Sequence, residues 1–183
     1  MKKGLKLRHI QTMGELDEYE EQNIAEGLAW LGRQKQDCTK YGFWLKLHRR
    51  LFKNVWSWAG KIRKHELDNP DFCLPYQIWP EIKKLEDDLS FWLLKLTFPK
   101  TGIAARFHER IETIHPFTNG NGRFGRILVE YFCAQQMTAN PSWGLDSVHF
   151  PKERRQKYIA ALYNARNNKD YTLLERFMFQ PSG

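Results

Sequence analysis

Cysteine is scarce in this chain, and long apolar runs are missing. Its 183 residues include three cysteines, Cys38, Cys73 and Cys133, with no C-x-x-C pair among them. An odd number of widely spaced cysteines excludes a disulfide framework and a cysteine-rich zinc site, and is typical of a reducing compartment. The longest apolar run, residues 89–98, contains Lys95 and is about half as long as a membrane span. We therefore expect a cytoplasmic protein without a transmembrane helix.

Internal repeats, low-complexity tracts and Gly/Ser/Pro-rich linkers are also missing. The first ten residues begin like a signal peptide, but an acidic segment, residues 11–22, stands where the apolar stretch of such a peptide should be. We therefore expect no export. Hydrophobic residues make up 42% of the chain, which is too many for intrinsic disorder and enough for one core. We expect one domain over residues 1–183.

Positive charge dominates. The 29 Lys and Arg residues outnumber 21 Asp and Glu residues, which gives a net charge of +8. This charge favours an anionic partner, and it does not decide between a nucleic acid, a nucleotide and an acidic protein surface. A solvated basic face without any partner is an equally simple interpretation.

Apolar spacing predicts one helix after another. The clearest repeat alternates steps of four and three from Ile78 to Leu96 and is ended by Pro99, and a shorter helix must end near His115 because Pro116 follows. Helical spacing of apolar residues is missing only in residues 61–75, where two short strand-like pieces flank a turn signal. These patterns predict an all-α bundle with one small β-hairpin. Other helices are expected around residues 16–31, 44–55, 103–114, 127–132, 158–165 and 173–179.

Residues 115–126, HPFTNGNGRFGR, are rich in glycine, asparagine and arginine, which suit neither a core nor regular structure. They match G-x-G-x-x-G, but the preceding helix and Pro116 do not fit the buried strand of a dinucleotide site. No Gly-Lys-Ser/Thr follows, so a Walker A loop is excluded as well. His108, Glu112 and His115 could share one helix face, yet they break the H-E-x-x-H zinc pattern.

Anion binding at a helix start is the interpretation that remains. Gly120, Asn121 and Gly122 can turn successive backbone N–H groups towards a phosphate, and the start of the next helix adds its positive dipole end. Arg123 and Arg126 lie three residues apart on the first turn and suit a polyphosphate. His115, directly upstream, has a side chain able to accept a proton near neutral pH. These parts would serve to transfer a phosphate-containing group to a hydroxyl.

The same twelve residues resemble the Fic motif, H-P-F-x-D/E-G-N-G-R-x-x-R, with one departure at Asn119. Residues 104–114, 58–63 and 158–177 are similar to segments that flank this motif, its flap and its closing helices in that family. The resemblance covers most of the chain from about residue 40, and the order of elements is similar to the bacterial subfamily called mobile mystery protein B. It implies a Fic-type helical bundle with a core at 41–183 and an N-terminal helical extension at 1–40.

Fic enzymes typically transfer AMP from ATP to a Ser, Thr or Tyr hydroxyl of a protein and release pyrophosphate. By resemblance, His115 is the general base, Phe117 is a structural anchor of the loop, and Arg126 holds the γ-phosphate. The α- and β-phosphates would be held by Gly120, Asn121, Gly122 and Arg123. Doc-like relatives, a phosphotransferase branch, carry Lys in place of the glycine at position 122, so Gly122 favours AMP transfer.

Asn119 stands where the family usually has Asp or Glu as a ligand of Mg²⁺ or Mn²⁺. An amide oxygen can coordinate the ion but brings no negative charge. We therefore expect a weak metal site, or a nucleotide-binding regulatory module that no longer transfers AMP. A third class, a nucleic-acid-binding protein, is supported only by the net charge, because no reader motif is present.

The resemblance also implies partners. The predicted hairpin at residues 61–75 would be a flap onto which a segment of the target protein adds as a further strand, although Pro70 limits pairing there. Glu26, within Gln22–Gly27, resembles the glutamate of an inhibitory helix and would reach Arg126, with a solvated glutamate as the simpler alternative. A helix-turn-helix protein is a possible paired regulator.

Overall fold

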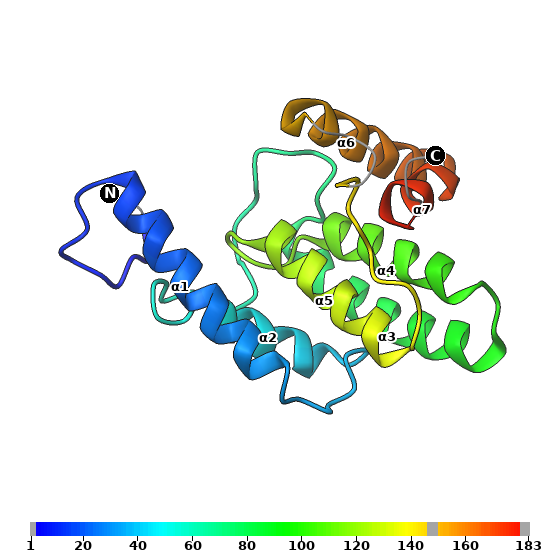
Figure 1. Ribbon diagram of the computed structural model, residues 1–183, viewed down its shortest axis with the longest axis horizontal. Helices are drawn as coiled ribbons and strands as arrows, with labels where there is room; N and C mark the ends of the chain where they lie inside the picture. The colour runs from blue at the N-terminus through cyan, green and yellow to red at the C-terminus, as the bar shows by residue number, and fades with distance from the viewer. Residues whose placement is uncertain (1–2, 146–149, 180–183) are drawn as a thin grey trace.

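The computed structural model describes residues 3–145 and 150–179, which form a helical bundle (Figure 1). Within these ranges the backbone forms seven α-helices, one short 3-10 turn and only isolated β-bridges. The helices are α1 (Met13–Leu31), α2 (Tyr41–Phe52), α3 (Ile78–Lys95), α4 (Lys100–Ile114), α5 (Asn121–Gln135), α6 (Pro151–Asn168) and α7 (Thr172–Phe179), and η1 (Pro75–Gln77) precedes α3. The prediction of an all-α fold is confirmed.

The helix ends follow signals in the sequence. Thr12 caps α1, because its side chain accepts from the Glu15 backbone N–H while the Glu15 carboxylate accepts from the Thr12 N–H. The α4 helix ends at His115, whose left-handed backbone (φ 45°, ψ 59°) is followed by Pro116. The predicted second helix is shorter than expected at its C-terminal end, since α2 stops at Phe52 and turns lead to Gly60 (φ 74°).

The α4 helix is the centre of the bundle. It packs against α3, α5, α6 and α7, while α1 packs along α2 and α2 reaches α5. Figure 1 shows the α1–α2 pair on one side of the molecule and the α6–α7 pair at the other end. No helix within residues 3–145 and 150–179 is both long and apolar enough to cross a membrane.

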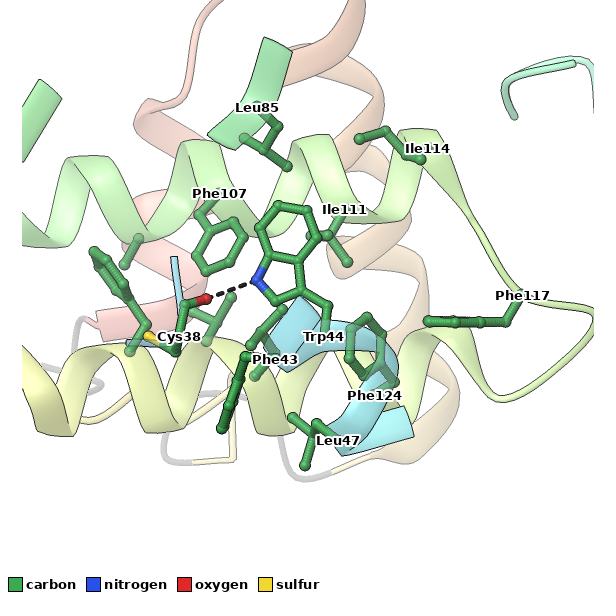
Figure 2. Close-up of a cluster of buried hydrophobic side chains, with 14 of the residues drawn as sticks. Cys38, Phe43, Trp44, Leu47, Leu85, Phe107, Ile111, Ile114, Phe117 and Phe124 are labelled. Atoms are coloured by element: carbon green, nitrogen blue, oxygen red, sulfur yellow. Dashed lines mark hydrogen bonds between the residues drawn. The ribbon is translucent and has the colours of Figure 1, made fainter. Parts of the chain in front are cut away.

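An aromatic core joins α2, α4 and α5 (Figure 2). Trp44 lies at its middle, tilted against Phe107, and its indole N–H donates to the Cys38 carbonyl at 2.6 Å. Phe117 and Phe124 meet edge to face, with ring centroids 5.1 Å apart. Because Phe117 is fully buried, the chain that connects α4 to α5 is fixed to the core at the position expected of an anchor.

Residues 61–75 do not form the predicted β-hairpin. Their backbone pairs with α4 and the residues after it through a bridge between Ile62 and Phe117, the Arg63 N–H to Pro116 carbonyl bond of 2.9 Å and the Cys73 N–H to Thr113 carbonyl bond of 3.0 Å. The Arg63 side chain is buried inside the loop, where it donates to the carbonyls of His65 and Cys73. These carbonyls are therefore satisfied by a guanidinium rather than by a facing strand, and the segment is an irregular loop attached to the end of α4.

Candidate active site

His115 lies at the C-terminal end of α4, and one of its ring nitrogens hydrogen-bonds to the backbone of that helix. Its Nδ1 is 3.1 Å from the Glu112 carbonyl oxygen, and because a carbonyl can only accept, Nδ1 carries the proton in the neutral ring. Nε2 is then the proton acceptor, and it has no hydrogen-bond partner within the part of the chain that the structure describes. The Phe72 ring stacks on the imidazole at 3.7 Å between centroids, with 10° between planes.

Burial keeps this imidazole neutral. Burial lowers the pKa of His115 to about 4, and the charges of Arg63 and Arg166 lower it further. The hydrogen bond to the Glu112 carbonyl acts in the opposite direction, because it favours the protonated ring. The side chain is nevertheless 17% exposed, so a group from outside can reach it. His115 is thus an unprotonated base at neutral pH.

The loop after His115 is held by its own side chains. The Asn121 side chain accepts from the Phe117 N–H at 2.9 Å and donates to the Phe117 carbonyl at 2.8 Å. Gly120 has a φ of 77°, and a Cβ there would lie 2.7 Å from Phe52 Cζ, so only glycine fits. Both polar atoms of the Asn121 side chain therefore bond within the loop. Only the backbone N–H of Asn121 is available to an anion.

The start of α5 presents unpaired backbone donors. Gly120 caps the helix without a side chain, and the first N–H bonded within the helix belongs to Phe124, which donates to the Gly120 carbonyl at 2.9 Å. The N–H groups of residues 121–123 therefore precede the regular ladder and lie at the positive end of the helix dipole. The Gly120 N–H is turned to Asn119 Oδ1 at 2.7 Å, so the predicted anion-binding concavity begins one residue later than expected.

The two motif arginines have different neighbours. Arg123 donates to Glu20 of α1, with 2.7 Å between Nη1 and Oε2, and lies over the Phe52 ring at 5.0 Å from its centroid. Arg126 instead faces α6 and lines an open cavity of about 580 Å³ together with Tyr158 and Trp143. The other residues that line this cavity are Leu145, Pro151, Arg154, Arg155, Ile159 and Phe177.

Glu26, the expected inhibitory residue, is not near Arg126 in this structure. It is exposed and accepts a hydrogen bond from the Asn54 side chain at 2.7 Å. The acidic side chain of α1 that reaches the motif is Glu20, which is buried and also accepts from the Trp56 indole at 2.7 Å. The structure shows no contact between Glu26 and Arg126 among the described residues, because α1 packs along α2 and turns a different carboxylate, Glu20, towards α5. The inhibitory role of Glu26 stays a prediction.

A comparison with known families decides the identity of this fold and loop. Residues 39–133, about half of the chain, match the Fic/DOC family. The chain belongs to this family. The resemblance drawn from residues 115–126 is therefore confirmed, and the matched range contains the whole loop from His115 to Arg126.

Named relatives carry the same domain within longer chains. The sequence is 31% identical over 127 residues to protein adenylyltransferase fic-1 of Caenorhabditis elegans, covering 66% of this chain and 23% of that protein. It is 32% identical over 123 residues to the probable protein adenylyltransferase y4lH of Sinorhizobium fredii, covering 63% and 62%. The chain thus spans less than two thirds of the length of these relatives.

Solved structures share the fold. The BepC protein of Bartonella tribocorum with bound AMPPNP superposes with a TM-score of 0.71 at 18% identity, covering 100% of this chain and 97% of that one. A Fic domain from Bartonella quintana with bound ADP gives a TM-score of 0.70 at 20% identity, covering 96% and 89%. At this identity the likeness shows the Fic fold.

The side chains of the Fic loop, residues 115–126, do not form a complete metal site by themselves. Asn119 supplies a neutral amide whose oxygen already accepts from the Gly120 N–H. Within residues 3–145 and 150–179, no three His, Cys, Asp or Glu side chains are placed to hold an ion. His108, weighed as a zinc ligand, instead has its Nε2 2.8 Å from the Tyr158 hydroxyl. A divalent ion therefore does not fit a site made by these side chains alone.

Two residues that support the Fic loop escaped the sequence analysis. His48 of α2 is buried and stacks on Phe117 at 3.6 Å; its Nδ1 accepts from the Gly60 N–H at 2.9 Å, and its Nε2 donates to the Asn119 carbonyl at 3.0 Å. Burial lowers the pKa of His48 to about 3. Arg63 donates through Nε to the His115 carbonyl at 2.7 Å. A histidine within the apolar stripe of α2 was a signal that could have singled out His48.

Proposed function

We propose that this Fic chain is a protein adenylyltransferase that transfers AMP from ATP to a Ser, Thr or Tyr hydroxyl of a target protein. The observation that carries the proposal is His115, a neutral imidazole with an available Nε2, placed directly before a helix start with unpaired N–H groups. The names of the relatives, which are protein adenylyltransferases, support the same activity.

The reaction follows from this placement. The hydroxyl oxygen of the target attacks the α-phosphorus of ATP, and its proton passes to His115 Nε2. A bond forms between that oxygen and the α-phosphorus, and the bond from the α-phosphorus to the bridging oxygen of the β-phosphate breaks. Pyrophosphate leaves, and AMP stays on the target. Charge on the phosphates is met by the N–H groups of residues 121–123 and by Arg126.

ATP is the substrate that this surface supports. The cavity beside Arg126 has aromatic walls from Trp143, Tyr158 and Phe177, which suit a purine, and arginines that suit phosphates. The related BepC structure holds AMPPNP. A nucleotide phosphate would compete with Glu20 for Arg123, because the Glu20 carboxylate is paired with Nη1 of its guanidinium.

The target protein approaches along residues 64–72, whose Phe72 covers the His115 ring. Backbone groups of this loop would pair with the target segment, the role expected of the flap strand. The target hydroxyl enters beside Nε2. We further propose that residues 41–183 are the transferring core and that residues 1–40 regulate it through α1. A helix-turn-helix regulator stays a prediction that no contact of the described residues tests.

A second candidate function rests on Asn119. A nucleotide-binding module without transfer would keep the helix start and both arginines but lack the carboxylate that usually holds the metal ion at this position. This candidate predicts ATP binding with no covalent product.

The experiment uses ATP with a radioactive phosphate at one of two positions. The chain is incubated with lysate proteins and with ATP labelled at either the α- or the γ-phosphate. AMP transfer labels proteins only from the α-position, while phosphate transfer labels them only from the γ-position. The α-label must depend on His115, so a His115→Ala variant is run beside the parent. Label from the γ-position, or α-label that persists in His115→Ala, would overturn the proposal.

A further inference from the structure

Glu112 is a buried carboxyl that the proposed reaction leaves without a role. It lies on α4, one turn before His115, and its carboxyl is shielded from solvent. Its Oε2 is 3.9 Å from His115 Nδ1. Its Oε1 has no hydrogen-bond partner among residues 3–145 and 150–179. A buried carboxyl with an unsatisfied oxygen costs stability, so its presence beside the base calls for an explanation.

The fold makes room for this carboxyl. A Cβ at Gly125 of α5 would lie 2.5 Å from Glu112 Oε1. The glycine at position 125 therefore creates the space in which the carboxyl sits against α5. A side chain there would displace the Glu112 carboxyl from this position.

Charged and titratable groups surround Glu112 on three helices. From α4 it faces His115, from α5 it faces Arg126, and from α6 it faces Arg166 and Tyr158. Burial raises the pKa of Glu112 to about 7, while Arg126 and Arg166 act to lower it. The Arg166 charge is largely balanced elsewhere, since Nη1 is 2.8 Å from Asp71.

We propose that Glu112 is a positioning residue for His115: its carboxylate, 3.9 Å from Nδ1, stabilises the imidazolium formed when Nε2 accepts a proton from the target hydroxyl, while the Glu112 backbone carbonyl holds the proton on Nδ1. The proposal rests on the proposed function of His115 as the base. Burial makes a charged ring costly at this position, and an opposite charge within about 4 Å offsets that cost. The proton that leaves the hydroxyl stays on the imidazole, and Glu112 supplies only its negative charge.

The state of Glu112 sets a pH dependence. Below about pH 7 its carboxyl is protonated and gives the ring no counter-charge; above this pH it is ionised. The transfer rate should therefore rise as the pH passes through this range, although His115 itself is already neutral well below it. A purely structural Glu112 would produce no such rise.

The decisive test is an NMR titration of the His115 ring C–H signals, which needs no activity. The chain has 6 histidines, and the signals that disappear in His115→Ala are those of His115. In the parent, the His115 signals should show an inflection near pH 7 from the neighbouring carboxyl, separate from protonation of the ring in acid. Glu112→Gln, which keeps the shape and removes the charge, should abolish the upper inflection.

Glu109→Gln is the matched control. Glu109 is a second buried carboxyl of α4, but it bonds to Thr113 and Tyr171 rather than facing His115, so this variant should keep the inflection near pH 7. A parent titration without that inflection would overturn the proposal even if neither variant folds. A Glu112→Gln titration that superimposes on the parent would overturn it as well.

The rate of AMP transfer provides a second test of the role of Glu112. At pH 8 and saturating ATP, Glu112→Gln should transfer AMP roughly 10- to 100-fold more slowly than the parent, and Glu112→Asp should recover part of the rate. An equal rate in Glu112→Gln would contradict the assignment. If no variant transfers AMP at all, the proposed function fails, while the NMR titration still decides whether Glu112 acts on His115.

Discussion

At the scale of single residues, Asn119 separates this chain from the usual Fic motif. Its amide oxygen caps the loop by accepting from the Gly120 N–H, a bond that an aspartate oxygen could also make. The substitution Asn119→Asp therefore keeps the loop and adds one negative charge where the family places its metal ligand.

We predict that Asn119→Asp lowers the Mg²⁺ concentration needed for half-maximal ATP binding by roughly tenfold, because a carboxylate is a stronger ligand of this ion than an amide. Calorimetric titrations with ATP at a series of Mg²⁺ concentrations measure the effect. Asn69→Asp is the control, since Asn69 makes a similar local cap, to the Asp71 N–H, outside the loop. An unchanged Mg²⁺ requirement in Asn119→Asp would show that position 119 does not contact the ion.

The residues of the motif could be named from the sequence because they are contiguous. Pro116 marks the helix end at His115, and the glycines mark the start of α5. The partners of these residues could not be named, since Glu20 lies 103 positions from Arg123 and His48 lies 71 positions from Asn119. Such contacts depend on how helices cross, which local patterns do not encode.

At the scale of elements, α1 brings Glu20 against Arg123, and we propose that this contact regulates access to the phosphate site. The Glu20 carboxylate is only 10% exposed and pairs with Arg123, the residue proposed to bind the nucleotide phosphates. The same side chain accepts from the Trp56 indole, an interaction that a glutamine can keep.

Glu20→Gln should therefore bind ATP more tightly, by about twofold to fivefold, which is the range expected for loss of a partly exposed ion pair. Glu26→Gln should leave the affinity unchanged, because Glu26 contacts Asn54 rather than an arginine. Both affinities are measured by calorimetry under one set of conditions. Tighter binding in Glu26→Gln alone would restore Glu26 as the inhibitory residue and refute the role given to Glu20.

The loop between α2 and α3 shows where element prediction failed. The strand-like pieces at residues 61–75 were identified correctly as non-helical, but the side chain of Arg63 takes the carbonyls that a hairpin would pair. The chemistry of one buried guanidinium thus outweighed the local strand pattern, whereas the helices with clear apolar spacing, such as α3, formed as predicted.

At the scale of the whole molecule, two buried histidines and the half-buried His115 make the fold sensitive to acid. Burial lowers the pKa of His48 and of His108 to about 3 and that of His115 to about 4. In the unfolded chain each would titrate near 6.5, so the unfolded state binds more protons between about pH 4 and 6.5. Their contribution to stability is therefore full above this range and is lost as the pH falls through it.

Glu112 acts in the opposite direction, because its raised pKa means that the folded state keeps a proton that the unfolded state loses between about pH 4.5 and 7. With three histidines against one carboxyl, the free energy of unfolding should fall by a few kcal/mol between pH 6.5 and 4.5. Urea unfolding at the two pH values measures it. Equal or greater stability at pH 4.5 would contradict the neutral state of these rings in the folded chain.

The most direct measurement of the central claim is the intact mass of the purified chain and its targets after incubation with ATP and Mg²⁺ or Mn²⁺. Parent and Glu20→Gln are compared with His115→Ala, which should still bind ATP because the base is not a phosphate ligand. We predict an added mass of one AMP on a protein treated with the parent or with Glu20→Gln, and none with His115→Ala. AMP addition by His115→Ala at the parental rate would contradict the account, because the proton would then have another acceptor.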